Sequence, residues 1–261
     1  MRVYEFGDTG KPVILLLPGT CCQWKGNFGK VIPLLLERFH VACVSYDGFD
    51  ETERMEFPSM LEETAKIEAW IQDRFNGRIR AAYGCSLGGS FVGLMAARQK
   101  IHMDYGILGS SDLDQMGRLT AKCITKLMIP LIYPLIHTGA FSNPLLRKRM
   151  ERQMAEKGAY GTAFMEMLGE KRVFITRKSV ENQFYSDLIT PLPEKIDPPG
   201  TEIHILYALK MGEKYRARYQ THFAHPVLHE LDLRHEELLA LYPQQWTELM
   251  EQICLTDTEK R

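Results

Sequence analysis

A serine flanked by glycines is the feature of this sequence most suited to chemistry. Residues 84–88 read Gly-Cys-Ser-Leu-Gly, with a strand-like run (79–83) before them and a helix-compatible run (91–97) after them. A serine on a sharp turn from strand to helix projects its hydroxyl above the edge of a sheet, and small neighbours allow so tight a turn. The pattern predicts that Ser86 is a nucleophile and that the N–H of Leu87, at a helix N-terminus, stabilises an oxyanion.

Buried strands are predicted on both sides of this turn. A continuous apolar run is typical of a strand buried on both faces of a parallel sheet. The sequence contains six such runs, at residues 13–17, 41–46, 79–83, 105–109, 203–207 and 227–231. Helical patterns at 28–39 and 59–75 separate the first three. This alternation predicts an α/β fold with a doubly wound, mostly parallel sheet, whose ligands bind at the carboxyl ends of the strands, where Ser86 lies.

One long region interrupts the alternation. It has four helical patterns rich in methionine and aromatic residues, at 116–128, 144–157, 162–171 and 179–188. Insertions of this length are usually functional, although ordinary surface helices are the alternative. We predict a core made of residues 1–112 and 200–261. A helical cap, residues 113–199, is inserted between the fourth and fifth predicted strands and covers the strand ends.

With the serine, the strands and the insertion in place, the chain resembles the α/β-hydrolases over nearly its whole length. Residues 84–88 match the family's nucleophile elbow, 15–20 match its oxyanion strand, and 113–199 match its cap domain in place and size. Pro18 replaces the histidine that usually ends that strand. Only six residues precede Gly7, so the first strand of the full family fold is expected to be absent.

The resemblance implies a catalytic triad in the chain order serine, acid, histidine. A serine hydroxyl is a weak nucleophile at neutral pH, and histidine suits the role of base because its pKa lies near the working pH. His235 follows the last predicted strand, where the family carries its catalytic histidine. A zinc site that includes His222, His225 and His229 is a weaker interpretation because the ligand spacing is irregular. We expect neither a metal nor a cofactor.

The acid of the triad is inferred rather than matched. The family usually carries an aspartate just after the penultimate strand, and Met211 stands at that position. Glu213, two residues further on, is our first choice for the carboxylate that orients the imidazole. Asp112, after the fourth predicted strand, is the alternative, and Asp232 ranks third.

The oxyanion hole is predicted to combine two backbone N–H groups. One belongs to Leu87, and the other lies in the loop after the first predicted strand, at Thr20 or Cys21. Cys21 and Cys85 would lie close to this site, where we interpret them as small apolar packing residues rather than reactive thiols.

The composition of the chain limits the kinds of partner and the cellular compartment that we expect. The 261 residues carry a formal net charge of −1, which argues against nucleic acid or an anionic membrane as the main partner. The most apolar stretch, 124–136, is interrupted by Lys126, Pro130 and Pro134, so no membrane span is expected. The N-terminus lacks the apolar core of a signal peptide, and the six cysteines form no CxxC pair. We expect a cytoplasmic protein with reduced thiols.

These observations predict a serine hydrolase. Its substrate would be a small, apolar carboxylic ester or related acyl compound, cleaved through an acyl-enzyme intermediate, because methionine and aromatic residues of the cap favour an apolar group. Fold alone does not decide the chemistry, so a peptidase, thioesterase, C–C hydrolase or lyase stays open. A non-catalytic ligand-binding protein on the same scaffold is a further alternative, since the acid is missing from its usual position.

Overall fold

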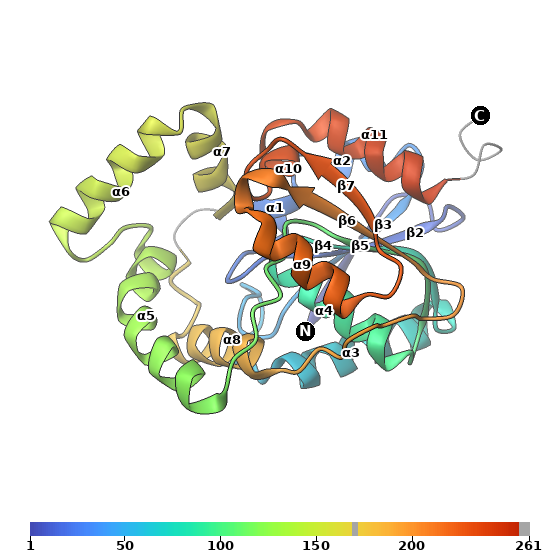
Figure 1. Ribbon diagram of the computed structural model, residues 1–261, viewed down its shortest axis with the longest axis horizontal. Coiled ribbons are helices and arrows are strands. Elements are labelled where there is room, and N and C mark those ends of the chain that lie inside the picture. Colours follow the sequence, from blue (N-terminus) through green and yellow to red (C-terminus); the bar gives the residue numbers. More distant parts are fainter. Residues whose placement is uncertain (169–171, 256–261) are drawn as a thin grey trace.

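A seven-stranded sheet forms the centre of the computed structural model, which describes residues 1–168 and 172–255 (Figure 1). The strand order is β1-β3-β2-β4-β5-β6-β7, and all neighbours are parallel except β1 and β3. The strands are β1 (Arg2–Phe6), β2 (Val13–Leu17), β3 (His40–Ser45), β4 (Arg78–Gly84), β5 (His102–Leu108), β6 (Glu202–Ala208) and β7 (Val227–Leu231). The six predicted strands are therefore confirmed, and β1 is an additional antiparallel edge strand.

Helices cover both faces of this sheet, so the predicted doubly wound architecture is confirmed. One face carries α3 (Met60–Phe75), α4 (Leu87–Arg98) and α9 (Glu213–His222) (Figure 1). The other face carries α1 (Trp24–Phe28), α2 (Ile32–Leu35), α10 (Glu237–Leu241) and α11 (Pro243–Cys254). Alternate residues of β2 serve the two cores: Leu15 packs with the first group of helices and Leu16 with the second. Both are fully buried, which explains the uninterrupted apolar run.

The segment between β2 and β3 differs from its prediction. We expected one helix over residues 28–39, but the chain forms two short helices, α1 and α2, separated by residues 29–31. Pro33 lies in the first turn of α2, where the backbone N–H that proline lacks would have no partner in the helix. In the middle of one long helix the same proline would be unfavourable, which explains why α1 does not continue into α2. The helix predicted over 59–75 is confirmed as α3, with the Ser59 side chain accepting a hydrogen bond from the Glu62 N–H as an N-cap.

Between β5 and β6 the described residues form four helices, which we call the inserted helices: α5 (Arg118–Thr138), α6 (Pro144–Glu156), α7 (Ala159–Leu168) and α8 (Arg177–Ile189). In Figure 1, α5, α6 and α7 stand beside the sheet, and α8 packs between α5 and α3. A 3-10 turn, η1 (Leu209–Met211), joins β6 to α9. The prediction of helices without strands in this region is confirmed for the part of it that the structure describes.

Helix α5 is longer than predicted. The sequence suggested an end at residue 128, but the helix continues through Pro130 and Pro134 to Thr138. Its length and composition would suit a membrane span, and 22% of its apolar window is buried. A single helix of this kind is weak evidence for a span, since helices of water-soluble proteins pass the same test. The helix is therefore longer than the sequence argument assumed, and the described residues give no clear sign of a membrane span.

Candidate active site

Ser86 lies on a strained turn between β4 and α4, as the sequence pattern predicts. Its φ of 49° falls in the left-handed region, which a non-glycine residue rarely adopts. The neighbouring glycines are required for packing, since a Cβ at Gly84 would lie 2.1 Å from the carbonyl carbon of Gly88. A Cβ at Gly88 would lie 2.2 Å from the Leu17 carbonyl oxygen. Strain of this kind is often stored at functional sites. We call residues 84–89 the elbow.

The loop after β2 lies directly against the elbow. A Cβ built on Gly19 would be 3.5 Å from the Ser86 Cβ. The Gly19 N–H donates to the Asn27 Oδ1 at 2.8 Å, which fixes the loop, and the Cys21 N–H donates to the Gln183 Oε1 of α8 at 2.7 Å. The Cys21 amide is thus already engaged, whereas within residues 1–168 and 172–255 the Thr20 N–H has no acceptor. Of the two predicted oxyanion donors in this loop, Thr20 is the one that remains.

The second oxyanion donor, the Leu87 N–H, begins α4. Gly88 and Gly89, which follow it, donate to the carbonyls of Cys85 and Ser86 at 2.7 and 2.9 Å, but the Leu87 N–H has no acceptor among the described residues. Leu87 and Thr20 therefore both offer a backbone donor beside Ser86. Such donors are what an oxyanion requires, and the N-terminus of α4 adds a favourable dipole.

His235 lies in the loop between β7 and α10. The Tyr160 hydroxyl of α7 donates to the His235 carbonyl oxygen at 2.9 Å, and the imidazole meets the Phe164 ring edge-on at 6.4 Å between centroids. The inserted helices therefore help to hold the histidine. Across the described parts of the chain the imidazole itself makes no hydrogen bond and no ion pair.

Asp112 is a partly buried carboxylate whose pKa responds to His235. Burial raises the pKa of Asp112, the charge of Asp114 raises it further, and His235 acts in the opposite direction. Arg218 of α9 donates to the Asp112 carbonyl oxygen at 2.7 Å, which holds this segment after β5. Among the described residues no hydrogen bond or ion pair joins Asp112 to His235, so their interaction is one of charge at longer range.

The structure does not bring Glu213 to His235. Glu213 is the first residue of α9, its side chain is 77% exposed, and its nearest cation is Arg216 at 3.8 Å. A carboxylate at that position gains from the helix dipole without any catalytic role. Asp232 is 84% exposed and pairs with Lys210 at 3.4 Å. Glu213 and Asp232, two acids considered from their positions in the sequence, therefore both face solvent.

Glu236 is a buried carboxylate that sequence reasoning missed. It is 5% exposed, and its Oε1 accepts hydrogen bonds from the N–H groups of Ser86 and Ser110, both at 2.8 Å. Its Oε2 accepts from the Tyr83 hydroxyl at 2.9 Å. Because Glu236 follows His235 in the chain, its carboxylate ties the histidine loop to the elbow. In the sequence it is one acid of an Arg-His-Glu-Glu run, and no local pattern distinguishes it from a surface residue.

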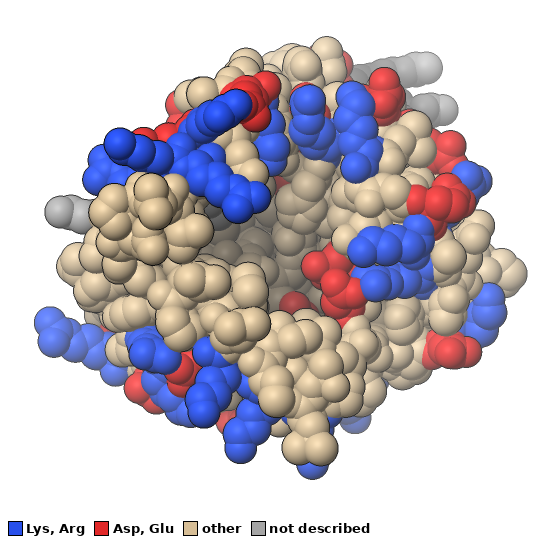
Figure 2. Space-filling model, turned by 60° about the vertical axis from the view of Figure 1, so that its left-hand side comes forward, with Lys and Arg blue, Asp and Glu red and all other residues tan. Residues whose placement is uncertain are grey.

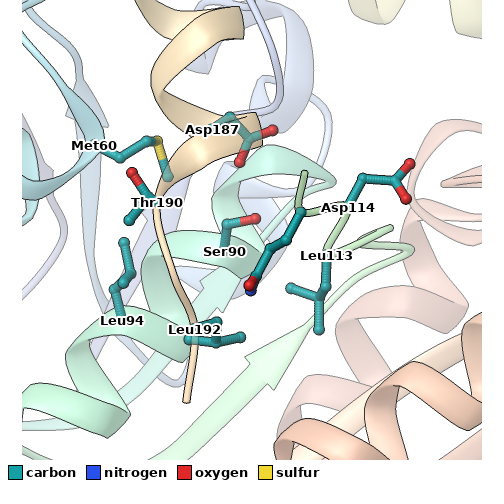
Figure 3. Close-up of a pocket in the computed structure, with 9 residues that line it drawn as sticks. Met60, Ser90, Leu94, Leu113, Asp114, Asp187, Thr190 and Leu192 are labelled. Carbon is teal, nitrogen blue, oxygen red and sulfur yellow. The ribbon is translucent and has the colours of Figure 1, made fainter. Parts of the chain in front are cut away.

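A further acid, Asp187 of α8, lies close to the site. Figure 3 shows it above Ser90 of α4 and beside Asp114, around a small cavity of about 10 Å³, roughly the room that one water needs. Burial, followed by the charges of Asp112 and Asp114, raises the pKa of Asp187 to about 8. Asp187 is therefore mostly protonated at neutral pH and adds little negative charge beside Asp112.

A larger cavity of about 180 Å³ begins at the oxyanion loop. Thr20 and Cys21 form its base and Arg172 lies in its wall. Apolar side chains of the inserted helices complete it, namely Ile132, Leu135 and Ile136 of α5, Met165 of α7 and Phe184 of α8. Figure 2 shows the side of the molecule on which α5–α7 lie, with a hollow whose walls are mostly uncharged, with Lys and Arg side chains along its upper rim and Asp or Glu side chains at its right-hand edge.

The remaining histidines and the cysteines lie where ordinary structural roles account for them. His229 of β7 stacks on His204 of β6 at 5.2 Å, and burial lowers the pKa of both. In the described ranges no three His, Cys, Asp or Glu side chains form a group that could hold a metal ion. Burial raises the pKa of the Cys21 and Cys85 thiols well above their usual values, so both are neutral packing groups.

Comparisons with known proteins identify the fold. No protein-family model matches this chain, and no curated protein matches its sequence. Among solved structures, an alpha/beta hydrolase family protein from Desulfitobacterium hafniense is similar, with a TM-score of 0.75, 18% identity, and coverage of 97% of this chain and 99% of the other. A marine microorganism esterase is similar with a TM-score of 0.70, 16% identity and coverage of 97% and 98%. MenH from S. aureus follows with a TM-score of 0.69, 12% identity and coverage of 99% of both chains.

The chain therefore has the fold of the α/β-hydrolase superfamily, and the resemblance seen in its sequence is confirmed at that level. Identities this low show the fold alone. They leave the reaction, the substrate and the site residues to be argued from the geometry of this chain.

Proposed function

We propose that this protein is a serine hydrolase that cleaves small carboxylic esters through an acyl-enzyme intermediate, with Ser86 as nucleophile and His235 as base. The observation that carries the proposal is the strained Ser86 turn, packed through Gly84 and Gly88 against the end of β2. That geometry leaves the Thr20 and Leu87 N–H groups without acceptors among the described residues beside the serine. One of the similar solved structures is that of an esterase, which supports this chemistry.

The reaction uses these groups in sequence. His235 accepts the proton of the Ser86 hydroxyl while Oγ attacks the ester carbonyl carbon. The negative charge that develops on the carbonyl oxygen is stabilised by the Leu87 and Thr20 N–H groups. The tetrahedral intermediate collapses as the imidazolium gives its proton to the leaving alcohol. Water, activated by the same imidazole, then hydrolyses the acyl-enzyme and restores Ser86.

We assign the acid of the triad to Asp112 in place of Glu213. Asp112 is partly buried and interacts electrostatically with His235, whereas the Glu213 side chain is 77% exposed. A carboxylate stabilises an imidazolium far better when it is shielded from water than when it is exposed, because water screens charges. Asp112 orients the imidazole and balances its positive charge during the attack.

We further propose that the inserted helices act as a cap that supplies the acyl pocket. The cavity of about 180 Å³ starts at Thr20, beside the predicted oxyanion hole, and its lining is mainly apolar. An apolar cavity of ~150 Å³ can hold benzene, so this one has room for an acyl group of about six heavy atoms. All six cysteines are free thiols, which supports a reducing compartment such as the cytoplasm.

The test is a series of p-nitrophenyl esters with acyl chains of graded length. A cavity of this volume predicts that kcat/KM rises to an acyl chain of about six carbons and falls for longer chains. Turnover that is absent for every chain length, with the protein folded, would instead favour a ligand-binding protein or a different bond type.

A further inference from the structure

We propose that the cavity above Thr20 and Cys21 binds an acyl group that ends in a carboxylate, and that Arg172 recognises this carboxylate. The substrate class is then the half-ester of a short dicarboxylic acid. The inference rests on the proposed serine hydrolase function and specifies its substrate. Three observations carry it: a buried guanidinium without a charged partner among the described residues, an apolar cavity of limited size, and an excess of Lys and Arg on α5 and α6.

Arg172 is buried, and its guanidinium meets no carboxylate in the described ranges. It is 5% exposed, and its Nη1 donates to the Cys21 carbonyl oxygen at 2.7 Å. Its Nε–H is buried and has no hydrogen-bond partner among the residues that the structure describes. The Cys22 thiol beside it does not compensate the charge, because burial raises its pKa and keeps it neutral.

A buried cation without a counter-charge is costly, and a bound anion would remove that cost. The Nη1 group donates to the oxyanion loop, and the Cys22 thiol also lies beside the guanidinium. The edge formed by Nε and Nη2 carries the two parallel N–H groups that a planar carboxylate accepts in a bidentate pair, and its Nε–H has no partner among the described residues. Because the Nε atom is closed to solvent, this pairing requires the Arg172 side chain to turn toward the cavity. Arg172 can therefore hold the Cys21 loop and a ligand carboxylate at the same time.

The rest of the cavity limits the ligand. Its remaining lining is mostly apolar, so the group between the carboxylate and the ester is a hydrocarbon chain. The volume of about 180 Å³ accommodates about six heavy atoms, which corresponds to the three methylenes and the carboxylate of a glutaryl group. The ester carbonyl would then lie at the Thr20 end of the cavity, beside Ser86.

The surface charge favours an anionic substrate as well. Helices α5 and α6 together carry seven Lys or Arg residues and two Glu residues, although the whole chain has a net charge of −1. Figure 2 shows basic side chains along the upper rim of the hollow and acidic side chains at its right-hand edge, so the excess of positive charge lies on the side of the inserted helices. A local excess of positive charge raises the concentration of anions at such an opening and speeds their association.

The experiment compares two esters of the same shape. Monoethyl glutarate carries the carboxylate, and ethyl 5-methylhexanoate replaces its two oxygens by methyl groups. Hydrolysis is followed by titration of the released acid. We expect the wild-type protein to prefer monoethyl glutarate in kcat/KM. Arg172→Gln should lower that preference ~10–100-fold, the usual range for loss of a hydrogen bond to a charged group. Arg172→Lys keeps the positive charge but loses the planar pair of N–H donors, so its preference for monoethyl glutarate should lie between those of the wild-type protein and Arg172→Gln.

Arg177→Gln is the matched control, because Arg177 is an exposed residue of α8 that pairs with Glu181 and lies outside the cavity lining. It should leave the preference unchanged. Equal kcat/KM values of the wild-type protein for the two esters would overturn the proposal, and that comparison requires no variant to fold.

Calorimetry separates this proposal from the proposed function. Ser86→Ala protein is titrated with glutarate, which needs no turnover to bind. Glutarate binding that Arg172→Gln in the same background abolishes supports the carboxylate site, even if neither ester is hydrolysed and the hydrolase assignment fails. Ester hydrolysis without glutarate binding, and without preference for the half-ester, would contradict the carboxylate site while leaving the hydrolase function in place.

Discussion

Helix α4, which follows Ser86, has nine of its twelve residues buried, whereas α6 of the inserted helices has no buried residue. The elbow that precedes α4 is packed so closely that no Cβ fits at its glycines, and the Glu236 carboxylate fixes it from beneath. The inserted helices contact the core through polar links such as Gln183 to Cys21 and Tyr160 to His235, and through a few buried apolar side chains such as Ile129 and Val180. We propose from this comparison that the closely packed core supplies the catalytic groups and that the insertion contributes to substrate choice.

The largest loss of activity is expected from substitution of the two proposed catalytic residues of the core, Ser86 and His235. Ser86→Ala is expected to lower kcat by about 10⁴-fold or more, because only binding and the oxyanion hole remain. His235→Ala should be about as damaging, and the double variant little worse, since the two groups act as a unit. Steady-state kinetics on folded variants checks this. Near-normal turnover by folded Ser86→Ala would remove the catalytic role from the elbow.

Replacing the proposed acid of the triad should give the next largest loss of activity. Asp112→Asn should lower kcat by ~10²–10⁴-fold, because the imidazolium loses its partly buried counter-charge. Glu213→Gln is the matched control at an exposed carboxylate and should change kcat less than about threefold, since exposed charges contribute little. The reverse ranking, measured as kcat under saturating ester, would restore Glu213 as the acid.

These residues also show where the sequence was informative. The Ser86 turn and most of the apolar strands could be predicted because their signals are local: most residues of β2 to β6 are buried, and the glycines are set by contacts within the elbow. The two edge strands β1 and β7 are only partly buried, and of these only β7 was predicted, from its valine and leucine residues. The sequence could not rank Glu213 against Asp112, because tertiary packing and not local sequence decides whether a loop carboxylate is shielded: α9 directs Glu213 to solvent, whereas Asp112 is partly buried. Glu236 was missed for the same reason.

Glu236 tests how the core holds the catalytic serine, because its buried carboxylate accepts a hydrogen bond from the Ser86 N–H. Glu236→Gln keeps one acceptor oxygen but must place an amide NH₂ against the donors of Ser86, Ser110 or Tyr83. We expect a loss of stability of about 1–3 kcal/mol and a kcat lower by about tenfold. Denaturant unfolding and ester kinetics measure the two effects. Glu237→Gln, the adjacent acid, should leave kcat nearly unchanged, whereas equal losses in both variants would deny Glu236 a positioning role.

The smallest expected effect is on the pH dependence of stability, through Asp187 at the junction between the core and the inserted helices. The pKa of Asp187 is about 8 in the folded protein, above the value of ~3.9 for an unfolded aspartate. The folded state therefore retains a proton that the unfolded chain releases, and stability falls as the pH rises from about 4 to about 8. Asp187→Asn should raise Tm at pH 8.5 by a few degrees, at ~2–4 °C per kcal/mol, with little change at pH 4. An equal shift at both pH values would contradict this origin.

Covalent labelling tests the central claim most directly. A fluorophosphonate reacts with a serine that a neighbouring base and an oxyanion hole activate, and it adds one phosphonyl group to that hydroxyl. Mass spectrometry of the wild-type protein should show one adduct, mapped to the peptide that contains Ser86, and Ser86→Ala and His235→Ala should both suppress it. A folded wild-type protein that stays unlabelled, or an adduct on a different serine, would contradict the assignment of Ser86 as the nucleophile.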